Sequence, residues 1–218
     1  MFGMAFAAGP DIIIRHDTPD HRYRALGEKY RQTVVEIALP TGSADRPRRG
    51  NGNGTLVAPQ WILTAAHVAS VIMPGHPRNR ASGTHIVYIA DRPYEVDRVF
   101  LHPAWTRMDS PADLALIKIK TAAAGGVPAC LYPNEDEVSQ VAVLVGNGLF
   151  GTGLRGPIDN DAYIRGATVR IEGVKADGTL LWWPFRAPGD PDVTELEGIS
   201  GPGDSGGPAF LHHEGRCA

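Results

Sequence analysis

Turn-forming residues constrain the fold of this chain more than any other feature. The 218-residue sequence contains 26 Gly and 18 Pro. Both residue types interrupt long helices and favour tight connections between short elements. We therefore expect many short strands and few long helices.

Short runs rich in β-branched and aromatic residues lie between these turns and predict strands. These runs cover residues 34–39, 55–57, 61–64, 84–90, 94–101, 114–119, 140–145, 167–174 and 179–183. The last two flank Asp177-Gly178, a pair that favours a β-hairpin. Strands at this spacing, without alternating helices, predict an all-β sandwich or barrel. Residues 20–31 could form a short helix or a charged loop, and we predict a turn-rich loop over residues 40–53.

The charge pattern and hydropathy narrow the range of partners. The formal net charge is -3 and the charges are well mixed, so a nucleic-acid partner is not expected. No apolar run reaches the roughly 18 residues of a membrane span. The histidines of His212-His213-Glu214 are typical of a polar turn rather than a metal site. We expect no cofactor, no metal and a monomer.

The first residues and the cysteines leave two alternatives open. Residues 1–8 are apolar, and Ala5-Phe6-Ala7 has the A-x-A form of a signal-peptidase site, but no basic region precedes it. This stretch is either the remnant of a signal peptide or an ordinary frayed terminus. Cys130 and Cys217 could form one bridge or remain free thiols.

The segment Gly203–Pro208 (GDSGGP) is the most specific motif of the chain. A serine between glycines can occupy a tight turn with its hydroxyl exposed. The glycines also allow backbone N–H groups to converge on one point, which is the geometry of an oxyanion hole. Ser205 is therefore a candidate nucleophile.

A serine hydroxyl is a weak nucleophile at neutral pH and needs a base within hydrogen-bond reach. His67 follows Thr64-Ala65-Ala66 at the end of a predicted strand, and histidine titrates in the required range. Asp113 comes directly before a predicted buried strand. A carboxylate on the second ring nitrogen would fix the histidine tautomer and stabilise the imidazolium. Each residue alone is typical of a structural role, but together they predict a hydrolytic site.

These motifs resemble those of the trypsin-like serine endopeptidases of the chymotrypsin superfamily. They occur in the order His, Asp, Ser, and the segments Gly54–Val57 and Phe100–Pro103 show smaller similarities to the same family. The resemblance covers roughly residues 33–213. It implies an all-β fold of two packed antiparallel β-barrels. Residues 31–121 would form the first barrel, residues 122–218 the second, and residues 1–30 an N-terminal segment.

The resemblance also implies roles for individual residues. His67, Asp113 and Ser205 would be catalytic, and the backbone N–H groups of Gly203 and Ser205 would form the oxyanion hole. The carboxylate that matches Asp204 supports this hole in the family by pairing with a new N-terminal ammonium. The substrate would be a polypeptide, and the protein would be secreted or exported.

Specificity is less clearly indicated. Counting back from Ser205 places Ile199 at the base of the specificity pocket, with Ser200 beside it. Ile199 argues against a preference for Lys or Arg, although a shift in register would bring in Glu195 or Glu197. The same triad would also serve an esterase.

The sequence departs from the family in three respects. Val68, Gly52 and Gly201 stand where the family has half-cystines, and we interpret Val68 as an apolar filler. The activation-like segment Ile12–Ile14 follows Asp11 and not a basic residue. The chain also ends soon after Ser205, so we expect an incomplete second barrel. A truncated enzyme and an inactive remnant or binding module are both open alternatives.

Overall fold

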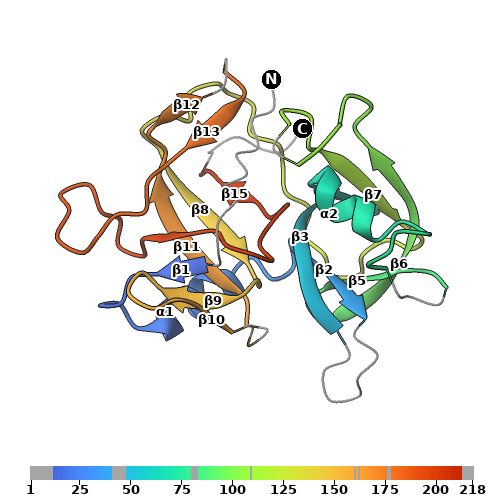
Figure 1. Cartoon of the computed structure of the whole chain (residues 1–218), viewed down its shortest axis with the longest axis horizontal. Helices are drawn as coiled ribbons and strands as arrows, with labels where there is room; N and C mark the ends of the chain where they lie inside the picture. Colours follow the sequence, from blue (N-terminus) through green and yellow to red (C-terminus); the bar gives the residue numbers. More distant parts are fainter. Residues whose placement is uncertain are drawn as a thin grey trace. The chain divides into compact units, whose positions relative to one another are not determined.

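The computed structural model describes residues 12–40, 48–79, 83–108, 110–159, 161, 163–175 and 178–212. The chain divides into two compact units. We call Arg31–Ala129 with Ser205–Gly207 the barrel unit. We call Met1–Tyr30, Cys130–Asp204 and Pro208–Ala218 the sheet unit. Figure 1 shows the path of the chain and the strands of each unit.

The barrel unit contains a closed barrel of antiparallel strands in the order β2-β3-β4-β7-β6-β5. The strands are β2 (Val34–Pro40), β3 (Arg48–Ala58), β4 (Trp61–Thr64), β5 (Ile86–Ile89), β6 (Arg92–Leu101) and β7 (Ala115–Ile119). Closure leaves no unpaired strand edge. The short helix α2 (Ala66–Val71) follows β4 and packs against β3, β6 and β7 (Figure 1).

The barrel core follows from the alternation of the strands. Side chains that point inward are fully buried, among them Ile37, Leu56, Ile62 and Ile117. Burial alternates along β4, β5 and β7, as expected for a sheet with one face on the core. A shift of one residue would expose this whole set, so the pattern specifies the register.

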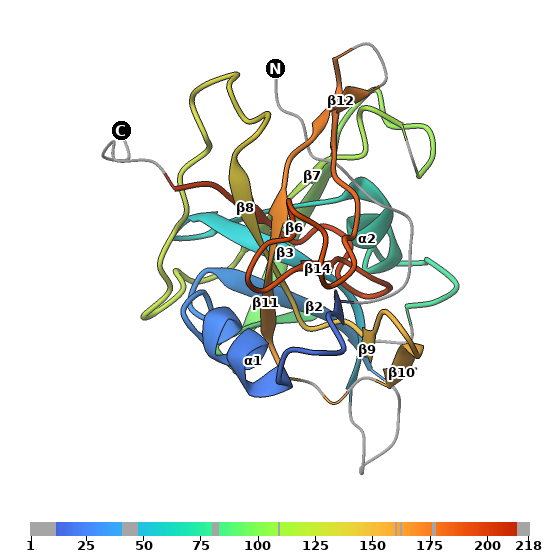
Figure 2. The same ribbon diagram turned by 90° about the vertical axis from the view of Figure 1, so that its left-hand side faces the viewer.

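The sheet unit contains three sheets in its described part. The first has the order β10-β9-β1-β14 and is formed by β10 (Gly156–Asp159), β9 (Phe150–Thr152), β1 (Ile12–Ile14) and β14 (Gly198–Ile199). The second has the order β11-β8-β15 and is formed by β11 (Arg165–Arg170), β8 (Val141–Gly146) and β15 (Ala209–Phe210). The third pairs β12 (Gly173–Lys175) with β13 (Leu180–Trp182). Helix α1 (Asp20–Glu28) packs on β11, as Figure 2 shows.

Two apolar clusters lie inside this unit. One is formed by Ile12, Ile14, Tyr23 and Ala167, with Phe150 and Leu196 packed against it. The other is formed by Ala142, Leu144, Val169 and Ile171, with Leu181, Trp183 and Leu211 packed against it. The first cluster joins β1, α1 and β11, so the N-terminal segment is part of the core of this unit.

The expected all-β class is confirmed, with one closed barrel and further sheets. Most predicted strands are present, and the region left open between helix and loop begins with α1. The prediction of a loop over residues 40–53 is wrong at its end, because β3 already starts at Arg48. Gly50, Gly52 and Asn53 pair with β2 through their backbones, which a pattern of side chains does not reveal. The single strand predicted over residues 167–174 is two strands, β11 and β12.

Candidate active site

The carboxylate of Asp113 holds His67 at two points. Asp113 Oδ2 lies 2.6 Å from His67 Nδ1, and Asp113 Oδ1 accepts the backbone N–H of His67 at 2.8 Å. The side chain of Asp113 is 1% exposed and that of His67 is 20% exposed. One buried carboxylate therefore fixes both the main chain and the ring of the histidine.

This geometry determines the proton chemistry of the ring. When Nδ1 donates to Asp113, the neutral imidazole has Nε2 as its acceptor. A proton taken up at Nε2 produces an imidazolium next to a buried carboxylate, which stabilises that charge. The contact with Asp113 thus leaves His67 Nε2 available to accept a hydrogen bond or a proton.

Small residues position His67. The sequence predicts it at the end of a strand, whereas it lies in the first turn of α2. Ala65, Ala66 and Ala69 are fully buried, so this short helix sits close against the barrel. Just upstream, the Thr64 hydroxyl donates to the backbone carbonyl of Asn53 at 2.6 Å and ties the end of β4 to β3.

Ser205 lies against the same part of the barrel unit. Its backbone carbonyl accepts the N–H of Asn53 at 2.7 Å. The next residue, Gly206, has φ +78, and a Cβ there would collide with Thr64 Oγ1 and the backbone of Asn53. All three predicted catalytic residues are thus in the barrel unit, where His67 and Asp113 bond directly and the Ser205 backbone is tied to β3.

Asp204 organises the turn that leads to Ser205. It is buried, and its two carboxylate oxygens accept the N–H groups of Gly148 at 2.8 Å and Gly201 at 3.0 Å. Gly203 has φ +92, a conformation that glycine adopts without steric cost. Side chains at Gly146 or Gly148 would collide with Asp204. The supporting residue predicted from the sequence is therefore enclosed by glycines.

The predicted pocket residues lie at the end of the first sheet of the sheet unit. Ile199 belongs to β14 and pairs with Ile13 of β1, and both Ile199 and Ser200 are half-buried. The alternative carboxylates have other roles. Glu195 is exposed and pairs with Arg22, whereas Glu197 is fully buried and its oxygens accept protein hydrogen bonds.

Gly52 and Val68 lie side by side, at two of the positions where the family has half-cystines. A Cβ on Gly52 would lie 2.6 Å from both Cγ atoms of Val68, and Val68 is buried. The valine thus fills this space as an apolar residue. Cys130 is disulfide-bonded, and Cys217 lies outside the described residues.

The sequence pattern did not identify two residues that support the site although they lie far from it along the chain. Asn53 holds the Ser205 backbone, and Gly148 donates to Asp204. Gly146 and Gly148 flank Asn147 at the end of a predicted strand. Two glycines at this place indicate a close backbone approach, because glycine leaves room for another group.

The described part of the chain contains neither a cluster of metal ligands nor a membrane-spanning helix. No group of three or more His, Cys, Asp or Glu residues there could hold a metal ion. No helix there is both long and apolar enough to cross a bilayer. His212 is exposed, and His213 and Glu214 lie outside the described residues.

Comparisons with known proteins identify the family of the chain. The family model described as Trypsin matches residues 41–216. Complement C1r-B subcomponent of Mus musculus is 30% identical over 186 residues, which cover 72% of this chain and 25% of that protein. Complement C1r-A subcomponent of Mus musculus is 31% identical over 121 residues, covering 47% of this chain and 16% of that protein. This chain thus spans a quarter or less of the length of these relatives.

A solved structure supports the fold. Neuropsin, described as a serine protease expressed in the limbic system of mouse brain, superimposes with a TM-score of 0.51. The sequence identity is 18%, and the match covers 90% of this chain and 80% of neuropsin.

Proposed function

This chain belongs to the trypsin family, and we propose that it is a serine endopeptidase with Ser205, His67 and Asp113 as its catalytic triad. The observation that carries the proposal is the double hydrogen bond from Asp113 to the ring and the backbone of His67. A histidine that served only packing would not need both its tautomer and its main chain fixed by one buried carboxylate.

The reaction would proceed through an acyl-enzyme. Ser205 Oγ attacks the scissile carbonyl carbon while His67 Nε2 takes its proton. The N–H groups of Gly203 and Ser205 stabilise the developing oxyanion. His67 then gives the proton to the leaving amine. A water molecule, activated by the same histidine, attacks the ester and releases the second product.

Two further observations support the proposal. The Ser205 backbone is held by Asn53, and the Asp204 carboxylate orders the turn before it, so the nucleophile has a defined position. Cys130 is disulfide-bonded, which fits secretion or export to an oxidising compartment.

Active-site labelling tests the assignment of the nucleophile. We expect the wild-type chain to react with a fluorophosphonate probe and the Ser205→Ala variant not to react. Ser139→Ala, the same change at an exposed serine, should label like wild type. Asp113→Asn should lower kcat by about 10⁴-fold, because the histidine would adopt the wrong tautomer.

The outcomes separate the alternatives. A folded wild-type chain that never labels would refute the proposal and favour a non-catalytic binding module. Labelling together with hydrolysis of esters but not of peptide amides would instead identify an esterase.

A further inference from the structure

The segment Thr194–Ile199, which leads to the predicted pocket residues, is held by hydrogen bonds from other parts of the sheet unit. Leu196 exchanges two bonds with Thr168 of β11: its carbonyl accepts the Thr168 N–H at 2.8 Å, and its N–H donates to Thr168 Oγ1 at 3.2 Å. At the other end of the segment, Ile199 pairs with Ile13 of β1. The segment therefore depends on residues distant in sequence for its position.

Glu197 forms the centre of this segment. Its side chain is fully buried. Oε1 accepts the N–H of Arg186 at 3.1 Å, and Oε2 accepts the N–H of Thr194 at 2.9 Å and lies 2.7 Å from the Thr194 hydroxyl. A buried carboxylate is tolerated only when its lone pairs are satisfied in this way. The Glu197 carboxylate thus holds Thr194 and the backbone of Arg186 close to it through these hydrogen bonds.

Tyr23 of helix α1 reaches the same residue from the opposite end of the unit's sequence. Its hydroxyl donates to the backbone carbonyl of Glu197 at 3.0 Å and accepts the N–H of Arg15 at 3.3 Å. The ring is fully buried, and burial raises the pKa of Tyr23. One hydroxyl therefore connects the residue after β1, helix α1 and the segment Thr194–Ile199.

Close backbone packing against β11 fixes the position of helix α1. A Cβ on Gly27 of α1 would lie 2.7 Å from the backbone carbon of Arg165, and a Cβ on Gly166 would lie 2.7 Å from Leu26 Cγ. Glycines on both surfaces thus allow α1 to approach β11 more closely than larger residues would. The position of Tyr23 follows from this approach.

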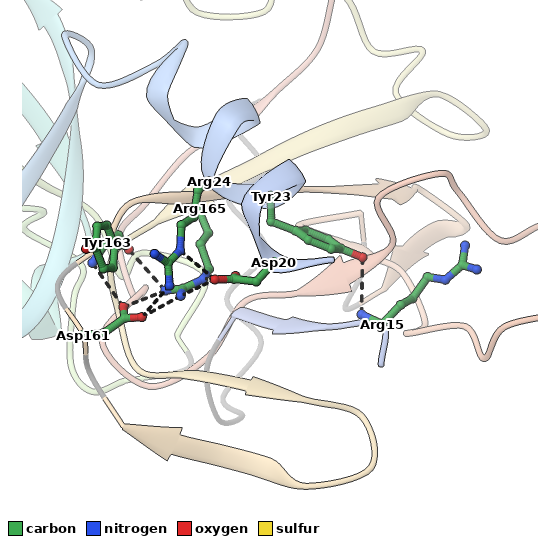
Figure 3. A network of polar contacts seen from close by, with 7 residues as sticks. All are labelled: Arg15, Asp20, Tyr23, Arg24, Asp161, Tyr163 and Arg165. Atoms are coloured by element: carbon green, nitrogen blue, oxygen red, sulfur yellow. Dashed lines mark hydrogen bonds and ion pairs between the residues drawn. The ribbon is translucent and has the colours of Figure 1, made fainter. Parts of the chain in front are cut away.

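An ion-pair cluster around the buried Arg165 fixes the first turn of the helix (Figure 3). Arg165 is 2% exposed and bonds to Asp20 at 2.7 and 3.0 Å and to Asp161 at 2.8 and 2.7 Å. Arg24 pairs with Asp20 at 2.6 Å and stacks on Tyr163, 3.8 Å from the ring centroid. In Figure 3 the Tyr23 side chain extends away from this cluster toward Arg15.

We propose that helix α1 is a positioning element for substrate binding, and that Tyr23 and Glu197 are its positioning residues. The Tyr23 hydroxyl and the Glu197 carboxylate together hold Thr194–Ile199, and this segment places Ile199 and Ser200. The part that concerns substrate rests on the proposed peptidase function. The His67–Asp113 bonds and the bond from Asn53 to the Ser205 backbone lie within the barrel unit, so we expect the helix to act mainly on peptide binding and less on the reactivity of the nucleophile.

The Tyr23→Phe variant tests this role, since it removes the hydroxyl and keeps the buried ring. The loss of the hydrogen bond to the Glu197 carbonyl, the one that holds the segment, corresponds to a change of about five-fold. We expect KM for a peptide-amide substrate to rise about five-fold, with kcat and the rate of fluorophosphonate labelling within about two-fold of wild type. Amide hydrogen exchange in residues 194–199 should accelerate by a similar factor.

Tyr163→Phe is the matched control, because Tyr163 is 52% exposed and stacks on Arg24 through its ring. It should leave KM and exchange unchanged. Thr194→Val, which removes the hydroxyl beside Glu197, is a second variant and should reproduce the effect of Tyr23→Phe. It decides the question if Tyr23→Phe does not fold.

Two results would overturn the positioning role. One is a Tyr23→Phe variant that matches Tyr163→Phe in both KM and hydrogen exchange. The other is a fall in the labelling rate as large as the change in KM, which would indicate a general disturbance. If the wild-type chain itself neither labels nor hydrolyses peptides, the proposed function fails, and hydrogen exchange alone then decides whether Tyr23 holds the segment.

Discussion

In the barrel unit six strands close on a mainly apolar interior, whereas in the sheet unit short strands are joined by buried charged groups. Within the residues that the structure describes, Arg165, Arg186, Glu197 and Asp204 are buried in the sheet unit. The buried carboxylate of the barrel unit, Asp113, belongs to the proposed triad.

The difference follows from the strand geometry. A closed barrel satisfies its backbone groups through its own ladders, so its interior can be apolar. Strands of two or three residues, such as β14 and β1, leave neighbouring backbone groups that need other partners. Glu197 and Asp204 supply acceptors to such groups. We therefore expect the barrel unit to be sensitive to changes in volume and the sheet unit to be sensitive to changes in charge.

The largest effect on stability should come from Arg165→Met. This change keeps an unbranched side chain but leaves the carboxylates of Asp20 and Asp161 without their buried partner. Hydrogen bonds to charged groups contribute about 1.5–3 kcal/mol each to the free energy of unfolding, and this change removes those that Arg165 makes to two carboxylates. Urea denaturation followed by circular dichroism would measure it.

The control is Arg22→Met, which removes an exposed pair with Glu195. An exposed pair contributes only about 0–1 kcal/mol. If Arg165→Met and Arg22→Met lowered the free energy of unfolding equally, the buried charges would not stabilise the sheet unit as we infer.

A change of volume in the barrel unit should have the next largest effect. Gly206→Ala places a methyl group against Thr64 and the backbone of Asn53, in a conformation with φ +78. Overpacking costs about 1–3 kcal/mol, and the left-handed backbone adds about 1–2 kcal/mol for a residue other than glycine. Because the loop must shift, we also expect fluorophosphonate labelling of Ser205 to be lost.

Gly178→Ala provides the comparison for that variant. Gly178 has φ +91, and no atom would lie within 4 Å of its Cβ. The Gly178→Ala variant should therefore lose only the about 1–2 kcal/mol that a left-handed backbone costs a residue other than glycine. Fluorophosphonate labelling of Ser205 should persist. A Gly206→Ala variant as mild as Gly178→Ala would contradict the close packing described for the barrel unit.

The smallest effects should appear in the pH dependence of the free energy of unfolding. Each unit should lose stability in its own pH range. In the barrel unit His85 is buried, and burial lowers its pKa below the ordinary value, with a smaller opposing effect from the Ala38 backbone. The unfolded chain then takes up a proton that the folded chain does not. The free energy of unfolding should therefore fall as the pH drops below about 6.5, by at most about 1.4 kcal/mol per pH unit.

In the sheet unit, burial alone would raise the pKa of Asp161, but hydrogen bonds from Arg165 and from the Tyr163 backbone hold it below the usual value. Its contribution is complete above the unfolded pKa of about 3.9 and is lost as the pH falls through the lower folded value. Urea denaturation of His85→Gln and Asp161→Asn between pH 7.5 and 3 would separate the two ranges. The assignment fails if His85→Gln removes the dependence below pH 4 or if Asp161→Asn removes the dependence near pH 6.

The sequence was informative where the determining information is local. Strand β7 was visible as an apolar run, and the Gly203–Pro208 motif identified the turn at Ser205 because a backbone with positive φ and little space requires glycine. The turn at Ala90 and Asp91, in which both residues have positive φ, was not predicted, since neither is glycine or asparagine. The pairing of β5 and β6 on either side of it imposes that conformation.

The amino-acid sequence by itself determined the class of fold and the residues proposed for the chemistry, because alternation of apolar residues and short motifs are properties of neighbouring positions. Only the tertiary structure decided that Glu197 is an internal acceptor and not a pocket carboxylate, and that Tyr23 holds its backbone. Whether a charged side chain lies inside or outside depends on donors that come from distant parts of the chain. Those donors meet only when the strands have paired, so no local pattern can reveal them.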